Sequence, residues 1–326
     1  SSSCGVSAEQ RAAFMSRSSS PTRSDLEEYS ERLFNVTTYN DDDRIIMILK
    51  MFVSLGVIRK LQVPFQKLVQ FICTVRGCYS ADTPYHNWTH AVDVAQFVFS
   101  CVMRGRLRLY LQDVELFALL LAAVCHDIDH RGLNNSFHKK AKTALGILYE
   151  ERPVMEMHHC ALSIRLLGLP ENDLLEGIEN PAEKSHFFEF FIKIILATDM
   201  DKHFAFIKEF EEITSNFDKR NERHRLLLAQ IIMKAANMSN TTRPFEVASD
   251  MAHSMSDEFF KQGDLERQLG IEVTQSCDKS KASHISDAQL NFYEFFAAPL
   301  FTALGNFIPA LADNSDQLEK NKKQWE

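Results

Sequence analysis

The sequence predicts an all-α fold, a single compact multi-helix bundle, and three observations support this prediction. Glycine and proline are scarce, with 11 and 9 residues among 326, so few residues interrupt helices. Little of the chain shows the two-residue alternation of a half-buried β-strand. Hydrophobic residues make up 45% of the chain and include 25 phenylalanines, which is enough to fill a sizeable core.

The beginning of the chain differs in composition from the rest. Residues 1–25 are rich in serine, with three consecutive serines at 1–3 and again at 18–20, followed by Pro21. This composition predicts a disordered leader or linker, which leaves residues 26–326 as the folded domain. The alternative is that the residues from Leu26 onward extend a first helix.

Apolar periodicity then predicts the helices in order. Two amphipathic segments lie within residues 43–79 and are separated at Gln62-Val63-Pro64. Further helices are predicted at 88–105, 113–130, 154–167, 183–198, 202–214, 221–238, 246–261 and 287–309. Pro153, Pro181 and Gly263 are among the residues that separate them. No internal repeat and no domain boundary appear after residue 40, so one compact domain is the simplest prediction.

Charge and cysteine content argue against several classes of protein. A formal charge of −8, without a long Lys/Arg-rich run, argues against a nucleic-acid groove. Seven cysteines without CxxC spacing predict a reduced, cytoplasmic protein rather than a disulfide framework. The apolar runs are too short to form a transmembrane segment, and no signal-peptide pattern opens the chain. Because the chain starts with Ser1 rather than Met, we expect it to be part of a longer protein.

One stretch concentrates side chains that could bind a metal ion. The sequence VCHDIDHRG (124–132) follows a uniformly apolar run, and YHNWTH (85–90) lies just upstream. Two imidazoles and two carboxylates at the end of a buried helix are costly unless something binds them. Two pairs of histidines have the four-residue spacing that places side chains on one helix face: His86 with His90, and His126 with His130.

The distribution of histidines strengthens the prediction of a metal site. Seven of the 12 histidines fall between residues 86 and 159. A single buried histidine is usually a satisfied core residue, and one HxxxH pair often arises by chance. An adjacent His-Asp pair that converges with a distant histidine is instead what a divalent metal with nitrogen and oxygen ligands needs. We therefore predict a metal site around His126 and Asp127.

At these residues the chain resembles the catalytic domain of the class I 3′,5′-cyclic-nucleotide phosphodiesterases. The matching motifs occur in order within residues 60–305: YHNWTHA, HDIDHRGLNNSF, MEMHH, ILATDMDKHF, EFFKQGD, CDK and AQLNFYEFF. Their details resemble the kinetoplastid branch of the family and, within it, the C-type enzyme. The resemblance implies a fold of the HD-type phosphohydrolases, with about sixteen helices around a central binuclear metal pocket. It assigns residues 26–326 to the catalytic domain.

The resemblance implies two divalent metal ions. His90, His126 and Asp127 would bind the first, typically Zn²⁺, and Asp127 would also bridge to the second, Mg²⁺ or Mn²⁺. Imidazole-rich coordination favours zinc, whereas magnesium keeps several waters and few protein oxygens. The two ions would share a bridging hydroxide that attacks the phosphodiester.

The family's fourth metal ligand is an aspartate, and this chain departs from the pattern there. The matching stretch is KAANMSN (234–240), which places Asn237 at that position. An amide oxygen can still coordinate, but it carries no charge. Three interpretations remain open: Asn237 binds with reduced metal affinity, the site is altered or inactive, or a neighbouring acid or water takes the position.

Four further residues receive roles from the resemblance. His86 would be the general acid that protonates the O3′ leaving group, which suits an imidazole near neutral pH. Glu156 would orient this histidine and metal-bound water, while His130 and Asp199 would fix the ligand orientations. The alternative for Glu156 and Asp199 is an ordinary carboxylate on a helix face. Two other histidines either take part in the site or only pack locally: His158 and His159.

Substrate recognition would lie in the C-terminal part of the chain. Gln289 matches the glutamine that forms two hydrogen bonds with the purine, and Phe292 matches the aromatic residue that stacks on it. Taken alone, these residues would be ordinary helix positions, so the assignment depends on the resemblance. Four more residues are expected to line the substrate pocket: Asn240, Met255, Tyr85 and Met200.

The predicted function is metal-dependent hydrolysis of cyclic AMP, with cyclic GMP as a second candidate substrate, to the 5′-monophosphate. A phosphohydrolase of nucleotide monoesters, a non-catalytic cyclic-nucleotide-binding module with a metal site weakened by Asn237, and a helical scaffold are the alternatives. Neither GxGxxG nor a P-loop motif occurs. A homodimer and regulatory modules upstream of Ser1 are compatible with this prediction.

Overall fold

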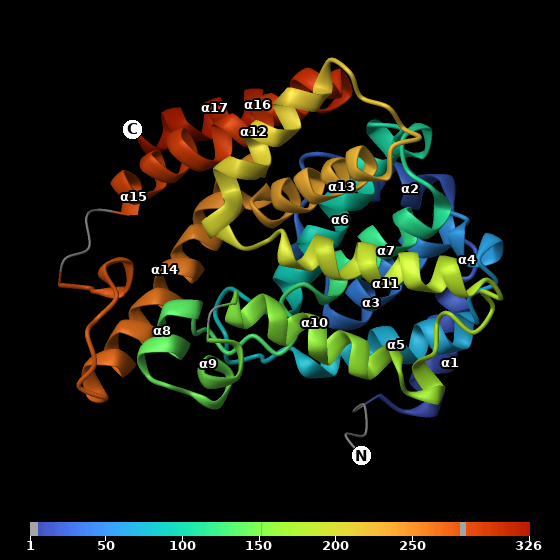
Figure 1. Ribbon diagram of the computed structural model, residues 1–326, viewed down its shortest axis with the longest axis horizontal. Helices are drawn as coiled ribbons and strands as arrows, with labels where there is room; N and C mark the ends of the chain where they lie inside the picture. Colours follow the sequence, from blue (N-terminus) through green and yellow to red (C-terminus); the bar gives the residue numbers. More distant parts are fainter. Residues whose placement is uncertain (1–5, 151, 281–284) are drawn as a thin grey trace.

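The computed structural model describes residues 6–150, 152–280 and 285–326, and these ranges contain helices, turns and loops but no β-strand. The all-α prediction is confirmed for these ranges. The α-helices (Figure 1) are α1 (Ala8–Ser18), α2 (Arg23–Ser30), α3 (Asp41–Ser54), α4 (Val57–Lys60), α5 (Phe65–Cys78), α6 (Trp88–Arg104), α7 (Asp113–Cys125), α8 (Asn135–Lys140), α9 (Ala144–Tyr149), α10 (Val154–Leu167), α11 (Pro181–Leu196), α12 (His203–Thr214), α13 (Glu222–Asn237), α14 (Phe245–Gln268), α15 (Ile285–Phe292), α16 (Ala298–Phe307) and α17 (Asp313–Trp325). No described helix is long and apolar enough to cross a membrane.

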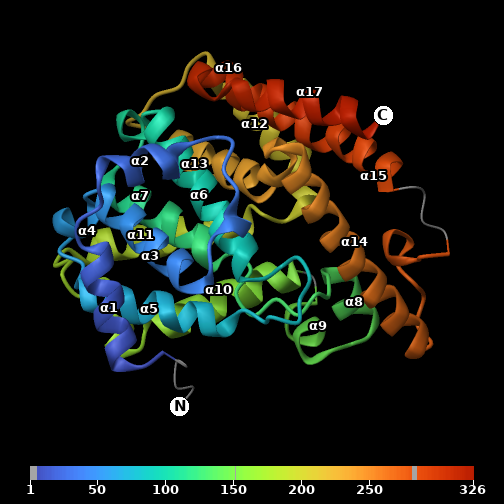
Figure 2. The same ribbon diagram turned by 180° about the vertical axis from the view of Figure 1, so that it is seen from behind.

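Helices α6 and α7 form the centre of the bundle. Every residue of α7 from Val114 to Cys125 is buried, as are 14 of the 17 residues of α6. Helices α11 and α13 pack against α7, while α1 to α5 and α14 to α17 lie on opposite sides of this centre (Figures 1 and 2). A helix that is apolar on all sides is expected in the interior, so the uniformly apolar run before the His-Asp motif explains the central position of α7.

The N-terminal region is helical, which corrects the predicted disordered leader at 1–25. Two capping boxes start its helices: Ser7 with Gln10, and Thr22 with Asp25. Phe14 is only 3% exposed, and α1 packs against α3 and α5. The serine-rich composition resembled a linker, but N-cap side chains each stabilise a helix by about 1 kcal/mol. Residues 1–5 of the predicted leader lie outside the described residues.

The helix predicted over 113–130 ends earlier, at Cys125, and turns follow it. Asp129 has a φ of +61°, in the left-handed region that few residues other than glycine adopt. This conformation cannot continue a right-handed helix. His126 and His130 therefore do not share a helix face, contrary to the prediction from their spacing.

Helix α6 begins at Trp88, between the two histidines of the pair His86 and His90. The side chain of Asn87 caps it by accepting hydrogen bonds from the backbone N–H groups of Thr89 and His90. His86 thus precedes the helix, and the predicted common helix face of His86 and His90 is also wrong. Their ring centroids lie 5.7 Å apart, edge to face, because the turn before α6 folds back on the helix.

Helix α14 runs beyond its predicted end and through Gly263. A Cβ atom at Gly263 would lie 1.9 Å from the carbonyl oxygen of Cys277, so only glycine allows the loop around η6 (Gln275–Cys277) to lie against the helix. The glycine therefore permits a close approach within a helix, whereas its sequence position suggested a helix end.

The predicted helix 287–309 is divided by a π-helical turn, η7 (Tyr293–Ala297). Pro299 follows at the start of α16. Because proline has no N–H and its ring clashes with the carbonyl four residues earlier, the preceding turn widens. The two halves of the predicted helix, α15 and α16, consequently have different registers.

The segment η5 (Ser239–Thr242) joins distant parts of the chain. Directly after it, the fully buried Arg243 forms an ion pair with Asp93 of α6 at 2.9 Å and donates a hydrogen bond to the carbonyl oxygen of Arg32. The side chain of Asn321 in α17 donates to two backbone carbonyls around η5, each at 2.8 Å. The turn after α13 is therefore bound to both the N-terminal region and the last helix.

Candidate metal centre

Four side chains from three helix ends converge on one point. The first turn of α6 supplies His90, the end of α7 supplies His126 and Asp127, and the last residue of α13 is Asn237. His90 Nε2 and His126 Nε2 lie 3.3 Å apart, and Asn237 Oδ1 lies 3.1 and 3.2 Å from them. Asp127 Oδ2 lies 3.4 Å from His90 Nε2 and 3.0 Å from His126 Nε2.

The four converging side chains offer many hydrogen-bond acceptors and few donors, which favours a bound cation. His126 Nδ1 donates to the carbonyl oxygen of Ala123 at 2.9 Å, so its Nε2 presents a lone pair to the centre. Burial lowers the pKa of His90, which favours the neutral ring. Asn237 Oδ1 and Asp127 Oδ2 are acceptors as well, and the latter is buried without a hydrogen-bond donor. A neutral His90 can offer at most one N–H to these buried acceptors, and a cluster with so few donors is unfavourable unless a positive ion joins it.

The spacing of the four atoms fits a bound metal ion. Bonds of about 2.0–2.2 Å place neighbouring ligand atoms about 3.0–3.5 Å apart in tetrahedral or octahedral coordination. The five distances above, from 3.0 to 3.4 Å, fall in this range. The donor set of two imidazoles, a carboxylate and an amide therefore fits a divalent cation in both geometry and chemistry.

Asp127 also faces a second direction. Its Oδ1 lies 3.7 Å from Nε2 of His159, whose Nδ1 donates to the carbonyl oxygen of Ile128 at 2.6 Å. The His159 Nε2 is buried without a partner, and burial lowers the pKa of this ring to about 4. Burial raises the pKa of Asp127, but the imidazoles of His126 and His90 outweigh it and hold that pKa well below its usual range. The ionised carboxylate of Asp127 therefore contributes one oxygen to the first group of acceptors, and its other oxygen lies beside the acceptor His159 Nε2.

His86 is held by Glu258 of α14. His86 Nδ1 and Glu258 Oε1 lie 2.5 Å apart, and Glu258 Oε2 accepts hydrogen bonds from the backbone N–H groups of Tyr85 and His86 at 2.9 and 3.0 Å. Burial lowers the pKa of His86, but the bond to Glu258 outweighs it and raises that pKa above its ordinary value. Burial raises the pKa of Glu258, whereas His86 lowers it, to about 2. Glu258 is therefore a carboxylate near neutral pH, and it favours the protonated form of His86.

The prediction that Glu156 orients His86 is wrong, because Glu258 makes this contact. Glu156 Oε2 accepts instead from Asn135 Nδ2 at 3.0 Å, and burial raises the pKa of this acid. Glu258 belongs to the EFFKQGD motif, to which the family resemblance assigns no role. It lies 172 residues after His86, so no local spacing could have indicated the pair. The role of Glu156 toward metal-bound water stays a prediction.

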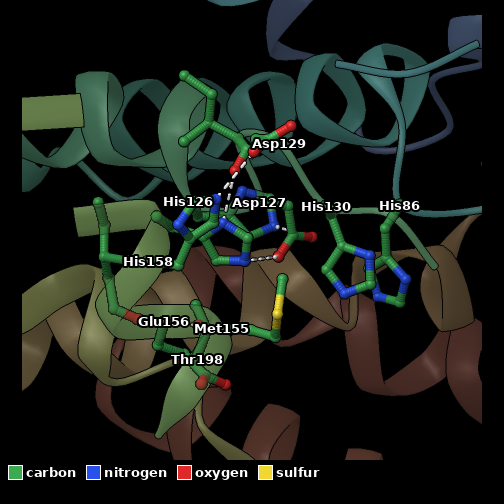
Figure 3. A network of polar contacts seen from close by, with 12 residues as sticks. His86, His126, Asp127, Asp129, His130, Met155, Glu156, His158 and Thr198 are labelled. Carbon is green, nitrogen blue, oxygen red and sulfur yellow. Dashed lines mark hydrogen bonds and ion pairs between the residues drawn. The ribbon is translucent and has the colours of Figure 1, made fainter. Parts of the chain in front are cut away.

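The other residues predicted around the ligands are close to the centre but differ in their contacts. The ring of His130 stacks on that of His86 at 4.2 Å (Figure 3), and its Nδ1 accepts from the backbone N–H of Gly132. Asp199 is buried, and its Oδ1 accepts from the backbone N–H of Asp201. His158 binds Asp129 at 2.9 Å. Within the described residues, no hydrogen bond joins His130 or Asp199 to the four ligand atoms, so their orienting roles stay predictions.

A cavity of about 970 Å³ is lined by residues of η5, α14 and α15, and η5 begins two residues after Asn237. Four of the predicted substrate-binding residues line it: Asn240, Met255, Gln289 and Phe292. Tyr85 and Met200 are not among the described residues that line it. Tyr85 is buried with its ring 4.6 Å from that of His90, and Met200 is 38% exposed in the short turn before α12. The cavity is large enough for a nucleotide-sized ligand.

The fold and the site define an all-helical protein in which buried groups that could hold a divalent cation lie beside a histidine whose pKa a carboxylate raises. The sequence pattern of the family described as 3′5′-cyclic nucleotide phosphodiesterase matches residues 85–318. The chain therefore belongs to this family, as a class I member similar to the kinetoplastid enzymes.

Individual relatives agree with this assignment. The 3′,5′-cyclic-nucleotide phosphodiesterase regA of Dictyostelium discoideum is 32% identical over 295 residues, 90% of this chain and 37% of the relative. The high affinity cGMP-specific 3′,5′-cyclic phosphodiesterase 9A of Drosophila melanogaster is 35% identical over 86% of this chain and 18% of its own length. This chain thus spans less than two fifths of these curated relatives.

A solved structure shows that the likeness extends to the whole fold. LmjPDEB1 of Leishmania, in complex with IBMX, superimposes with a TM-score of 0.90 at 32% identity, covering 98% of this chain and 97% of that one. The phosphodiesterase domain of the RhoPDE fusion protein of Salpingoeca rosetta gives a TM-score of 0.86 at 26% identity, over 91% and 94% of the two chains.

Proposed function

We propose that this chain hydrolyses 3′,5′-cyclic nucleotides, cyclic AMP and also cyclic GMP, to 5′-nucleoside monophosphates. The convergence of His90, His126, Asp127 and Asn237 on one point, beside His86 with its raised pKa, is the observation that carries this proposal. The family membership supports the reaction, and the relatives include enzymes named for the general reaction and for the cGMP-specific one.

The chain's own residues supply the proton and the binding of the ions. Bound divalent ions would activate a water molecule and neutralise charge on the phosphoryl oxygens. His90, His126 and Asn237 would hold one ion, and Asp127 would contact both. His86 uses Nδ1 to bind Glu258, so its Nε2 is the atom that can give a proton to the leaving O3′. Glu258 raises the pKa of this histidine and so favours the protonated form that a general acid needs.

The cavity supplies the purine contacts. Gln289 can present both a donor and an acceptor to adenine or guanine, and the Phe292 ring can stack on either base. Phe292 is itself stacked on Phe296 at 5.6 Å, which holds its ring in place. This arrangement supports recognition of a purine but does not distinguish cyclic AMP from cyclic GMP.

The test is a hydrolysis assay with purified protein and three substrates: cyclic AMP, cyclic GMP and 5′-AMP. We expect turnover of a cyclic nucleotide, its loss with a chelator, and its return when zinc and magnesium are added. Turnover of 5′-AMP alone would show a monoester phosphohydrolase. Binding of cyclic nucleotide by the metal-loaded protein without any turnover would show a non-catalytic module.

Asn237→Asp is expected to raise zinc affinity and turnover. The substitution places a negative charge where Oδ1 lies 3.1 and 3.2 Å from two imidazole nitrogens, and charge is poorly screened at a buried site. We expect zinc affinity to rise by about tenfold or more, measured by competition with a chelator, and kcat to rise with it. Asn221→Asp is the control, because it adds the same charge at the N-cap of the same helix. Equal zinc affinity in Asn237→Asp and the unmodified protein would contradict the prediction.

The remaining assignments are proposals of the same kind. We propose Zn²⁺ at the imidazole-rich position and Mg²⁺ or Mn²⁺ at the second one, because of the preferences of these ligands.

The free thiols of Cys101, Cys125 and Cys160 support a reducing, cytoplasmic location. The greater length of the curated relatives supports regulatory modules outside this chain, and a homodimer and the C-type assignment stay predictions.

A further inference from the structure

Lys234 is a buried cation one turn before Asn237 on α13. Its side chain is 2% exposed, and its Nζ donates hydrogen bonds to the carbonyl oxygens of Ala197 at 2.9 Å and Asp199 at 3.1 Å. The ammonium also lies 5.6 Å from the centre of the Phe206 ring. Lysine is rarely buried to this extent, because removing its charge from water is costly.

The two carbonyls belong to the turn that follows α11. This helix ends at Leu196 with Ala197 as its C-cap, so the last carbonyls of the helix lack partners within it. A cation at this end satisfies them and interacts favourably with the helix dipole. Lys234 therefore ties the turn at 197–199 to the helix that carries Asn237.

The same ammonium interacts electrostatically with two carboxylates. Burial lowers the pKa of Lys234 to about 8, and the charges of Asp199 and Glu156 oppose this fall. The charges of Asp199 and Asp127 act in turn on Glu156. Glu156, Thr198 and Asp127 appear together in the polar network of Figure 3. Lys234 is therefore coupled electrostatically to Asp199 and Glu156, and Glu156 in turn to the ligand Asp127.

We propose that Lys234 is a positioning residue that sets the affinity of the second divalent ion and holds the turn at Thr198 and Asp199 for turnover. This inference rests on the proposed function, which requires a second ion beside Asp127. The ammonium repels a divalent cation, so its removal strengthens binding of that ion. The ammonium also holds the turn through two hydrogen bonds, so its removal slows the reaction.

Substitutions at this position separate the charge from the hydrogen bonds. Lys234→Met removes both, Lys234→Gln keeps an amide donor without the charge, and Lys234→Arg keeps the charge. The probe is Mn²⁺, titrated by calorimetry into metal-stripped protein reloaded with one equivalent of zinc. We expect the Mn²⁺ Kd to fall at least threefold in the Met and Gln variants and to stay unchanged in the Arg variant. We expect kcat for cyclic AMP to fall at least tenfold in Lys234→Met, with KM within twofold.

Gln230→Met is the matched control, because Gln230 lies one turn earlier on α13 and donates to the carbonyl oxygen of Lys193 in α11 at 3.0 Å. It removes a similar contact between the same helices, away from the site, and the Mn²⁺ Kd should not change. An unchanged or higher Mn²⁺ Kd in the neutral variants, or an equal change in Gln230→Met, would overturn the inference.

If Lys234→Met does not fold, the Gln and Arg variants decide by the same criterion. Unmodified protein that binds Mn²⁺ without hydrolysing cyclic nucleotide would contradict the proposed function, and the binding measurements would still decide the role of Lys234.

Discussion

Asp127→Asn is expected to abolish cyclic-nucleotide hydrolysis and to strip the centre of metal. Asp127 is the only charged residue among the four that converge, and its two oxygens face both groups of acceptors. Loss of its charge should reduce kcat/KM by at least about 10³-fold, which corresponds to about 4 kcal/mol of transition-state stabilisation. The measurement is kcat/KM for cyclic AMP together with the metal content of the purified protein.

Asp129→Asn provides the control for this result. Asp129 lies two residues further on and pairs with His158, outside the four converging atoms. Asparagine tolerates the left-handed backbone conformation of Asp129, so this variant should fold. We expect its metal content to match that of the unmodified protein. If Asp127→Asn keeps full metal content and turnover, this carboxylate is not a metal ligand.

Glu258→Gln should move the alkaline limb of the pH profile to lower pH and reduce kcat at pH 8 by about 10²-fold. His86 must carry a proton to act as a general acid, and Glu258 raises the pKa of this histidine above 6.5. Without the carboxylate the pKa falls, so His86 loses its proton at a lower pH. The profile of kcat/KM against pH measures the shift, and Glu246→Gln, exposed on the same helix, is the control. An unchanged alkaline limb would show that another group donates the proton.

The same pair makes folding stability depend on pH. The folded pKa of His86 is raised, so its contribution is complete below about pH 6.5 and is lost as the pH rises through the raised value. The folded pKa of Glu258 is lowered to about 2, so its contribution is present above about pH 4.5 and is lost as the pH falls toward 2. The difference in Tm between the unmodified protein and Glu258→Gln should therefore be largest between pH 4.5 and 6.5.

Local patterns predicted the parts of this fold that local interactions determine. The periodic segments became α6, α10, α11, α12 and α13 with ends within about two residues of the prediction, as expected for strongly amphipathic or apolar stretches. Prediction was wrong where a contact distant in sequence decided the backbone. The chain leaves the helix after Cys125 and reaches the left-handed Asp129, which pairs with His158, and Gly263 lies inside α14, where it lets the carbonyl of Cys277 approach.

The candidate site follows the same division. His90, His126 and Asp127 stand in two short motifs whose composition indicates a metal site, and the structure brings their ligand atoms together. Glu258 could not be found in this way, because a glutamate in a long amphipathic helix has no local feature that marks a partner 172 residues away. Only the folding of α14 against the start of α6 creates that pair.

The attachment of η5 has a consequence for how signals could reach this enzyme. Arg243, which follows η5, donates to the carbonyl oxygen of Arg32 and binds Asp93 and Gln96 of α6. Asn321 of α17 donates to the carbonyl oxygens of Thr241 and Arg243. A displacement of the segment after α2 or of α17 would therefore act on the turn that carries Asn240 and, through Asp93 and Gln96, on α6, which supplies His90. Domains fused to either terminus would thus have a short mechanical route to both the cavity wall and the metal centre.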